Sequence, residues 1–158
     1  MAIVARTVSI NAAFLQEIKD DHHELRQLLH HTGIMLNRPR WMPADLSRLV
    51  ELLSKLRDQV AMHFSLEEAY GYLDDAVDVA PRLSRRAEQL RSEHYDLYSQ
   101  LCRLADRAEQ VLYHETGETE LAALAEAFCL FSERFGAHER HESDLIVEAL
   151  DVDLGVGD

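Results

Sequence analysis

The chain has 158 residues, a length that suits one domain with a hydrophobic core of its own. Its composition is rich in Leu, Ala, Glu and Arg and includes only six glycines and three prolines, which is typical of an all-helical protein. The net charge of −13 argues against binding to nucleic acid or to an anionic membrane surface. No apolar run is long enough to cross a bilayer and residues 1–10 lack the pattern of a signal peptide, so we expect a cytoplasmic protein.

The first two predicted helices cover roughly residues 9–36 and 44–74. Ser9 or Asn11 is the expected N-cap of the first helix, and Pro43 suits the first turn of the second. The apolar stripe of the first helix runs through Leu15, Ile18, His22, Leu25 and Leu29. The stripe of the second helix runs through Leu46, Leu49, Leu53, Leu56, Val60, His63, Glu67 and Tyr70. Because these positions alternate in spacings of three and four, all of them should face the interior.

The third and fourth predicted helices cover roughly residues 81–114 and 118–150, separated by the break at Thr116-Gly117. The stripe of the third helix runs through Leu83, Ala87, Leu90, His94, Leu97, Leu101, Leu104, Ala108 and Val111. The stripe of the fourth runs through Leu121, Leu124, Phe128, Phe131, Phe135, His138, Glu142, Leu145 and Ala149. Four long helices joined by short turns predict a single all-α domain over residues 1–158, folded as an up-down-up-down antiparallel four-helix bundle.

Six polar residues interrupt these otherwise apolar stripes, with one His on each helix and a Glu four residues later on the second and fourth. They are His22, His63, Glu67, His94, His138 and Glu142. In an antiparallel hairpin, residues equidistant from the turn lie at the same height, and His94 and His138 are equidistant from Thr116. The remaining residues are symmetric about the other turns to within about one helical turn. All six side chains should therefore converge on one layer of the bundle.

A buried carboxylate is costly unless a positive charge neutralises it, and no Lys or Arg shares these stripes. A lone His on an apolar face is usually a hydrogen-bonded core residue, but six converging groups favour a metal site. Imidazole and carboxylate ligands without a thiolate suit Fe, Mn or Zn, and two glutamates that can each bridge favour a pair of ions. His23 is kept as an alternative to His22, since a small rotation of the first helix would exchange them.

These residues resemble the motifs of the hemerythrin family, specifically the bacterial hemerythrin-like or HHE cation-binding domains. The matching segments are Asp21-His22, His63-Phe-Ser-Leu-Glu67-Glu68, Glu93-His94 and His138-Glu-Arg-His-Glu142, and the likeness covers nearly the whole chain. The resemblance implies a non-haem di-iron centre bridged by Glu67, Glu142 and an oxo or hydroxo group. It also implies that the four stripe histidines are terminal ligands, namely His22, His63, His94 and His138.

The third helix departs from the oxygen-carrying hemerythrins. Those proteins have two His four residues apart on this helix, whereas the residues at that spacing from His94 are Leu90 and Tyr98. The missing imidazole leaves an open position or is replaced, and Tyr70, Tyr72 and Tyr98 are candidates for an extra ligand or for a hydrogen-bond partner of a ligand. Each tyrosine taken singly is better explained as an ordinary core or rim residue. Reversible oxygen carriage is therefore less expected than other functions.

Three functions are compatible with this sequence. The preferred one is a di-iron protein that binds O2 or a related small molecule for sensing, storage or iron handling. The second is a di-iron enzyme that decomposes peroxide or reduces nitric oxide through Lewis-acid and redox chemistry. The third is a metal-free bundle that serves as an interaction module. The expected partner is a small diatomic ligand or peroxide, with no role for nucleic acid or membranes, and the oligomeric state is left open.

Overall fold

The computed structural model describes the backbone of residues 12–117 and 119–155, and the side chains of residues 20, 22–117 and 119–151. Within these residues all regular structure is helical, with four long α-helices, one short α-helix and one 3-10 turn. They are α1 (Ala12–Leu36), α2 (Pro43–Ala69), α3 (Asp74–Val79), η1 (Pro81–Leu83), α4 (Ser84–Leu112) and α5 (Glu120–Gly155). The all-helical class predicted from the sequence is thus confirmed for the described part of the chain.

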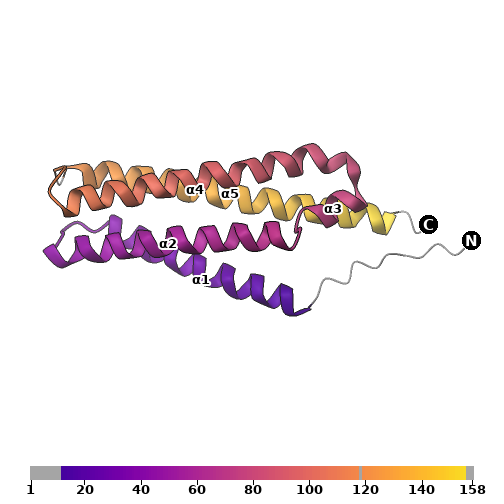
Figure 1. The fold of residues 1–158 in the computed structure, drawn as a ribbon, viewed down its shortest axis with the longest axis horizontal. Helices are drawn as coiled ribbons and strands as arrows, with labels where there is room; N and C mark the ends of the chain where they lie inside the picture. Colours follow the sequence, from indigo (N-terminus) through magenta and orange to yellow (C-terminus); the bar gives the residue numbers. More distant parts are fainter. Residues whose placement is uncertain (1–11, 118, 156–158) are drawn as a thin grey trace, which may run out of the picture.

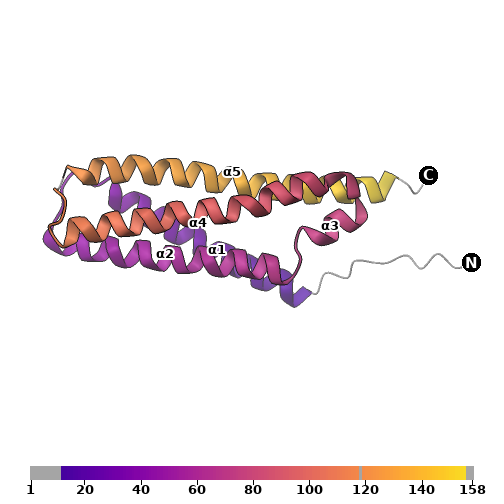
Figure 2. The same cartoon turned by 45° about the horizontal axis from the view of Figure 1, so that its top comes forward.

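The four long helices lie side by side along the length of the molecule (Figure 1 and Figure 2). α1 packs against α2 and α5, and α4 packs against the same two helices. At one end of the molecule α3 packs against α5 and forms part of the connection from α2 to α4. None of the helices in the described ranges is long and apolar enough to cross a bilayer. This arrangement turns the apolar stripes of the long helices toward a shared interior.

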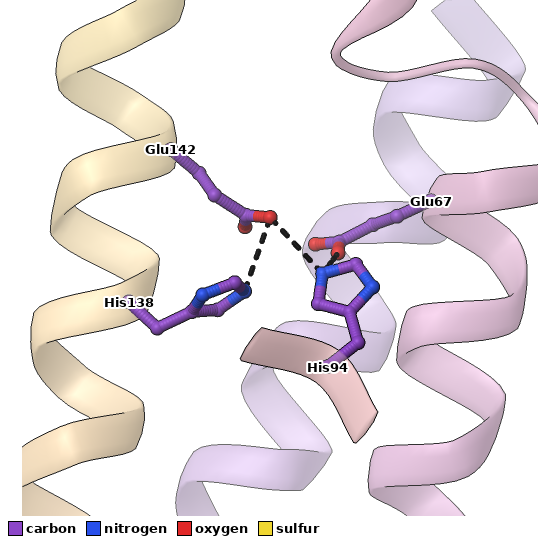
Figure 3. A group of neighbouring side chains, drawn as sticks. All are labelled: Glu67, His94, His138 and Glu142. Carbon is purple, nitrogen blue, oxygen red and sulfur yellow. Dashed lines mark hydrogen bonds and ion pairs between the residues drawn. The ribbon is translucent and has the colours of Figure 1, made fainter. Parts of the chain in front are cut away.

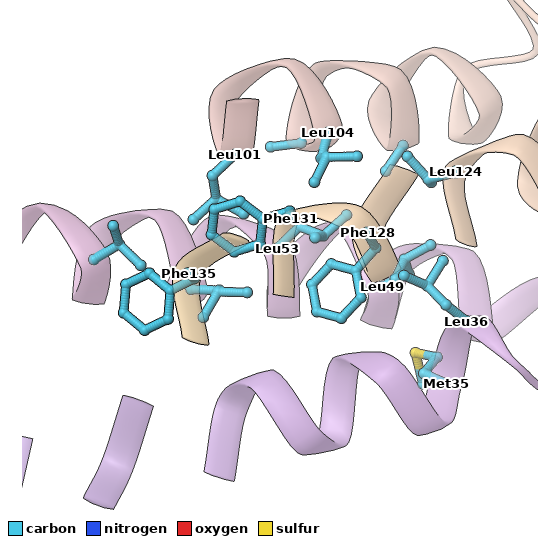
Figure 4. Close-up of a cluster of buried hydrophobic side chains, with 14 of the residues drawn as sticks. Met35, Leu36, Leu49, Leu53, Leu101, Leu104, Leu124, Phe128, Phe131 and Phe135 are labelled. Atoms are coloured by element: carbon cyan, nitrogen blue, oxygen red, sulfur yellow. The ribbon is translucent and has the colours of Figure 1, made fainter. Parts of the chain in front are cut away.

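The larger of two apolar clusters fills the interior toward the α1–α2 and α4–α5 connections (Figure 4). Phe128, Phe131 and Phe135 form a row along α5, with consecutive ring centroids 6.2 and 6.0 Å apart. Leu53 of α2 and Leu101 of α4 belong to the same cluster and are completely buried. Since each buried Leu or Phe contributes about 1.5–3 kcal/mol, this cluster is the main source of stability.

A smaller apolar cluster lies at the opposite end, where α3 and η1 meet α4 and α5. Its buried members are Leu73, Ala76, Ala80, Leu83, Ala87, Leu90, Leu145 and Ala149. Along α4, His94 stands between Leu90 of the smaller cluster and Leu97 of the larger one. Along α5, His138 and Glu142 stand between Phe135 of the larger cluster and Leu145 of the smaller one. A polar layer therefore separates two apolar clusters.

The end of α2 differs from the prediction, because the helix stops at Ala69 rather than near residue 74. Gly71 adopts a φ of 62°, in the left-handed region that residues with a Cβ atom rarely enter. Its N–H donates to the carbonyl of Glu68 at 3.3 Å, and the N–H of Tyr70 donates to that of Leu66 at 3.0 Å. A left-handed glycine after the last turn is a common way for a helix to end.

The start of α2 agrees with the prediction, since Pro43 is its first residue. The carboxylate of Asp45 accepts a hydrogen bond of 2.8 Å from the N–H of Met42, one of the donors that a helix N-terminus leaves unpaired. The expected N-caps of the first helix, Ser9 and Asn11, lie outside the described residues. The side chains of two stripe residues of that helix, Leu15 and Ile18, lie outside them as well.

Candidate metal centre

The polar layer holds five buried ionisable side chains, each no more than 6 % exposed: His63, Glu67, His94, His138 and Glu142. In the part of the chain that the structure describes, Thr32 is the one other buried polar residue, and its hydroxyl donates to the carbonyl of Leu28 at 2.7 Å. The described interior contains no buried Lys or Arg. The prediction that these stripe positions face the interior is confirmed, while His22, with 27 % of its side chain exposed, lies at the rim.

The first ligand group consists of Glu67 of α2, His94 of α4, and His138 and Glu142 of α5. These four side chains point toward one another (Figure 3), and each offers one ligand atom within 4.8 Å of the others. Nε2 of His94 is 3.4 Å from Glu67 Oε2 and 3.3 Å from Glu142 Oε1. Nε2 of His138 is 3.1 Å from the same Glu142 oxygen. Nitrogen and oxygen lone pairs from three helices therefore converge on one small volume.

The second ligand group consists of His22 of α1, His63 of α2 and Glu139 of α5, with ligand atoms within 4.8 Å of one another. Glu139 Oε2 lies 2.9 Å from His22 Nδ1, and its Oε1 lies 2.8 Å from His63 Nε2. Glu139 is not among the residues predicted from the sequence, because it lies one position off the central stripe of the fourth helix. A signal was available, since the residue after a stripe position lies at the edge of the apolar face and meets a neighbouring helix.

The carboxylate of Glu67 lies between the two groups. Its Oε1 is 2.9 Å from Nε2 of His63 in the second group, and its Oε2 faces His94 in the first. Glu142, by contrast, contacts His94 and His138 of its own group. The geometry thus suits Glu67 to contact two ions at once, and the bridging role expected of Glu142 stays a prediction.

Two further carboxylates hold the outer nitrogens of the first group's histidines. Nδ1 of His138 is 2.8 Å from Glu93 Oε2, and Nδ1 of His94 is 3.2 Å from Glu68 Oε1. The ring of Phe64 stacks on that of His94, with centroids 4.0 Å apart and planes 7° from parallel. A carboxylate on the outer nitrogen fixes the tautomer and orientation of a ligating imidazole and raises its basicity. Each Nε2 is therefore directed inward.

The electrostatics of the second group show tightly paired charges. Burial lowers the pKa of His63, but hydrogen bonds to Glu139 and Glu67 outweigh this effect and raise it to about 11. Burial raises the pKa of Glu139, but hydrogen bonds from His22 and His63 outweigh it and lower the value to about 2. Without a metal ion, the second group is therefore held together by an imidazolium and a carboxylate.

The first group is less evenly balanced. Burial raises the pKa of Glu67, and the charge of Glu142 raises it further. Burial also raises the pKa of Glu142, but the imidazoles of His138 and His94 outweigh it and hold the pKa below its ordinary value. For His138, burial lowers the pKa, whereas Glu142 and Glu93 raise it to about 9. Two carboxylates close together cannot both ionise easily unless a cation lies between them.

Two buried atoms in the first group make no well-oriented hydrogen bond among the described residues, Glu67 Oε2 and His138 Nε2, although each lies 3.1–3.4 Å from an atom of the same group. An unsatisfied buried polar atom costs about 1–3 kcal/mol, so two of them side by side in the interior need a physical reason. A divalent ion would accept both lone pairs and neutralise the carboxylates. The residues present therefore fit a metal ion, and imidazole with carboxylate suits Fe, Mn and Zn alike.

The remaining residues that the sequence suggested as extra ligands or as partners of ligands differ in where they lie in the structure. Tyr70 is 51 % exposed and lies outside both ligand groups, so the prediction that it faces inward is wrong; α2 has already ended at this position. Tyr98, 36 % exposed, and the exposed His23 also lie outside the groups. Tyr72 is half-buried, and burial together with the charges of Glu142 and Glu67 raises its pKa to about 12. Tyr72 is therefore the tyrosine placed beside the carboxylates.

Comparison of the chain with protein-family models, with curated proteins and with solved structures gives no match.

Proposed function

We propose that this chain is a hemerythrin-like protein that binds two metal ions, iron by resemblance, and takes up O2 or a related small molecule at them. In this proposal its four long helices form an up-down-up-down antiparallel bundle. The observation that carries the proposal is the position of Glu67, whose two carboxylate oxygens face His63 in one ligand group and His94 in the other. A carboxylate placed in this way is suited to binding two metal ions at once.

The charges of the layer support the same conclusion. Glu67, Glu139 and Glu142 bring three carboxylates into a region with no buried Lys or Arg among the described residues. Two divalent ions would neutralise these carboxylates and displace the protons that His63 and His138, whose pKa values are raised, otherwise carry. The outer carboxylates Glu68 and Glu93 then hold His94 and His138 with Nε2 directed toward the first ion.

The two halves of the proposed centre differ in how far solvent reaches their ligands. Four side chains form the first group, and all are buried. The second group supplies two imidazoles and one carboxylate beside the shared Glu67, and its members His22 and Glu139 are partly exposed. A set of two His and two carboxylates fills four positions of an iron ion that takes up to about six ligands, and the partly exposed side leaves room for another ligand. The second half is thus the place for the small molecule, where iron would supply redox and Lewis-acid chemistry.

Iron loading tests this proposal directly. Protein loaded with Fe2+ without oxygen and then exposed to air should hold about two irons per chain and show near-ultraviolet oxo-to-iron absorption. Glu67→Gln should lower the iron content and remove this absorption, whereas Glu51→Gln, on the exposed part of the same helix, should change neither. Full loading of the Glu67 variant would contradict the shared carboxylate, and iron-free wild-type protein would contradict the function.

Catalysis on peroxide or nitric oxide is the second candidate, because the partly exposed ligands His22 and Glu139 leave room for a substrate on their side of the centre. Reversible spectral change on deoxygenation of the iron-loaded protein would support binding. Gas evolution that depends on added peroxide would instead support catalysis. A chain that stays colourless, and whose melting temperature iron does not change, would favour the metal-free interaction module.

A further inference from the structure

A pocket of about 290 Å³ leads from the surface to the first ligand group. We name it the α2–α4 pocket, because it opens between the end of α2 and the neighbouring turn of α4. Its inner wall is formed by three members of the first group, Glu67, His94 and Glu142. Asp74 and Arg91, both largely exposed, stand on its wall as well and form an ion pair. The pocket therefore connects solvent with atoms that are otherwise buried.

A buried atom in the pocket wall has no hydrogen-bond partner among the described residues. Glu67 is only 6 % exposed, and its Oε2 accepts no hydrogen bond. Nε2 of His94 lies 3.4 Å from it. A carboxylate oxygen that is desolvated but unpaired attracts whichever cation can reach it. The pocket thus ends at a group that is incomplete without a positive charge.

The charge of the pocket selects the kind of molecule that travels through it. Four carboxylates line the wall, those of Glu67, Glu68, Asp74 and Glu142, against the single guanidinium of Arg91. The whole chain adds to this field with its net charge of −13. Clefts lined by one sign of charge concentrate ions of the opposite sign and speed their association. The pocket consequently favours cations and repels anions.

We propose that the α2–α4 pocket is the route by which divalent metal ions reach the centre, with the Asp74–Arg91 ion pair as its gate. The proposal rests on the proposed function, since it assumes that the two ligand groups bind metal. The route adds an order of loading to the proposed function. The ion arrives first at Glu67, His94 and Glu142 and then passes to the second group through the shared carboxylate.

The gate is suited to frequent opening. Both partners are exposed, by 41 % for Arg91 and 62 % for Asp74, and ion pairs at such positions contribute little to stability. Asp74 is held near the pocket by the turn after α2, where its N–H donates to the carbonyl of Gly71 at 2.9 Å. An approaching cation competes with Arg91 for the same carboxylate, so the ion that passes also releases the gate.

The test measures the rate at which metal-free protein takes up Co2+, by stopped-flow absorption. Arg91→Gln removes the repelling charge and should load about threefold faster than wild type at low salt. Arg91→Trp removes the same charge but fills the mouth, and should load about tenfold slower. Arg85→Gln and Arg85→Trp are the matched controls, because Arg85 is exposed on the same helix and is not part of the pocket wall. Both control variants should load at nearly the wild-type rate.

The two Arg91 variants are expected to change the rate of Co2+ loading in opposite directions, which distinguishes a route through the pocket from a general charge effect. Arg91→Trp protein that loads as fast as Arg85→Trp protein would overturn the route and leave the proposed function intact. Wild-type protein that takes up no Co2+ would overturn both. The amount of Co2+ bound at equilibrium should be the same in all five proteins, and a Co2+ deficit confined to Arg91→Trp at long times would also overturn the route, because it would mean a damaged site.

A second pair of variants tests the attracting charge at the mouth. Asp74→Asn should slow loading about threefold at low salt and by less at high salt, because screening weakens the attraction. Asp75→Asn changes the same charge on the adjacent exposed residue of α3, outside the pocket wall, and should have a smaller effect. Equal slowing by the two substitutions would contradict a specific role for Asp74.

Discussion

A carboxylate oxygen of Glu139 lies 2.8 Å from Nε2 of His63, while the residue before it, His138, reaches into the other ligand group. Consecutive residues of an α-helix point about 100° apart. Glu139 of α5 therefore contacts α1 and α2, whereas His138 of the same helix contacts α4. The two groups are joined through one helix as well as through the Glu67 carboxylate, and substitutions on α5 should separate their contributions.

Replacing the α5 carboxylates one at a time should empty the two positions separately. Glu139→Gln should leave about one ion per chain, held by the first group, because an amide is a poor ligand beside two imidazoles. Elemental analysis after loading and desalting gives the stoichiometry. Glu133→Gln is the control, since this residue is exposed on the same helix and outside both groups. Two ions retained in the Glu139 variant would show that this carboxylate is not a ligand.

The stability of the metal-free protein should fall in acid. The pKa of Glu139 is about 2 in the folded protein, against an ordinary value of 4.5. The contribution of this pKa shift to the free energy of unfolding is on the order of 3 kcal/mol. It is fully present above about pH 4.5 and is lost as the pH falls toward 2. Urea unfolding across this range should show the loss in wild type and a smaller one in Glu139→Gln. Equal pH dependence in the two proteins would remove Glu139 as its source.

In alkali the metal-free and metal-loaded proteins should diverge. The pKa of His138 is raised to about 9, so its pairing with Glu142 and Glu93 stabilises the fold fully below pH 6.5 and is lost as the pH rises through 9. A metal ion requires neutral imidazole, so metal binding should strengthen over the same range. Melting temperatures from pH 7 to about 9.5 should fall without metal and hold or rise with it. Parallel curves would contradict the assignment of His138 as a ligand.

Loss of an outer carboxylate should weaken metal binding without removing a ligand. Glu93→Gln takes away the partner 2.8 Å from Nδ1 of His138, and such changes typically cost 10–100-fold in metal affinity. Glu88→Gln, exposed on the same helix, is the control. Competition with a chelator gives the affinity, and stoichiometry at saturating metal should stay unchanged. A Glu93 variant with wild-type metal affinity would show that the contact between Glu93 and His138 does not contribute to metal binding.

Gly71→Ala should destabilise the protein, whereas Gly136→Ala should not. Gly71 has a φ of 62°, and a Cβ atom there would lie 3.1 Å from Asp74 Oδ2, so the cost should be about 1 kcal/mol or more. Gly136 lies inside α5, where a Cβ would meet only the flexible end of Arg140 at 3.4 Å. Alanine there should stabilise by about 0.5–1 kcal/mol. The urea concentrations at which the metal-free variants are half unfolded show whether each substitution stabilises or destabilises the protein. Equal midpoints for the two variants would contradict the left-handed conformation of Gly71.

The sequence predicted the fold class and the buried histidines well, because both follow from one periodic pattern. A stripe with spacings of three and four is continuous along each helix, so a His or Glu in its middle is expected to face the interior, as five of the six do while His22 lies at the rim. His94 and Glu142 are placed in this way by long stretches of Leu, Ala and Phe around them. Many residues contribute to such a pattern, so no single residue determines which side of the helix is buried.

Several features that depend on single residues were not predicted. Tyr70 continues the stripe in sequence, yet one left-handed glycine at position 71 ends the helix and leaves this tyrosine exposed. Glu139 lies one position off the stripe, and its role depends on how closely α1 approaches α5, which periodicity does not specify. Which of the three candidate tyrosines lies beside the carboxylates, and where the α2–α4 pocket opens, likewise depend on the path of the chain after α2.

The polar layer divides the interior into two unequal parts, and this has a consequence for motion. The larger cluster joins all four long helices, whereas the smaller one holds α3 and η1 against the ends of α4 and α5. Metal ions would tie the two parts together, and their departure would leave the smaller part with only its own modest hydrophobic contacts. The end that carries α3 would then open locally while the rest of the fold stays intact. Metal content would thereby control the mobility of one end of the protein.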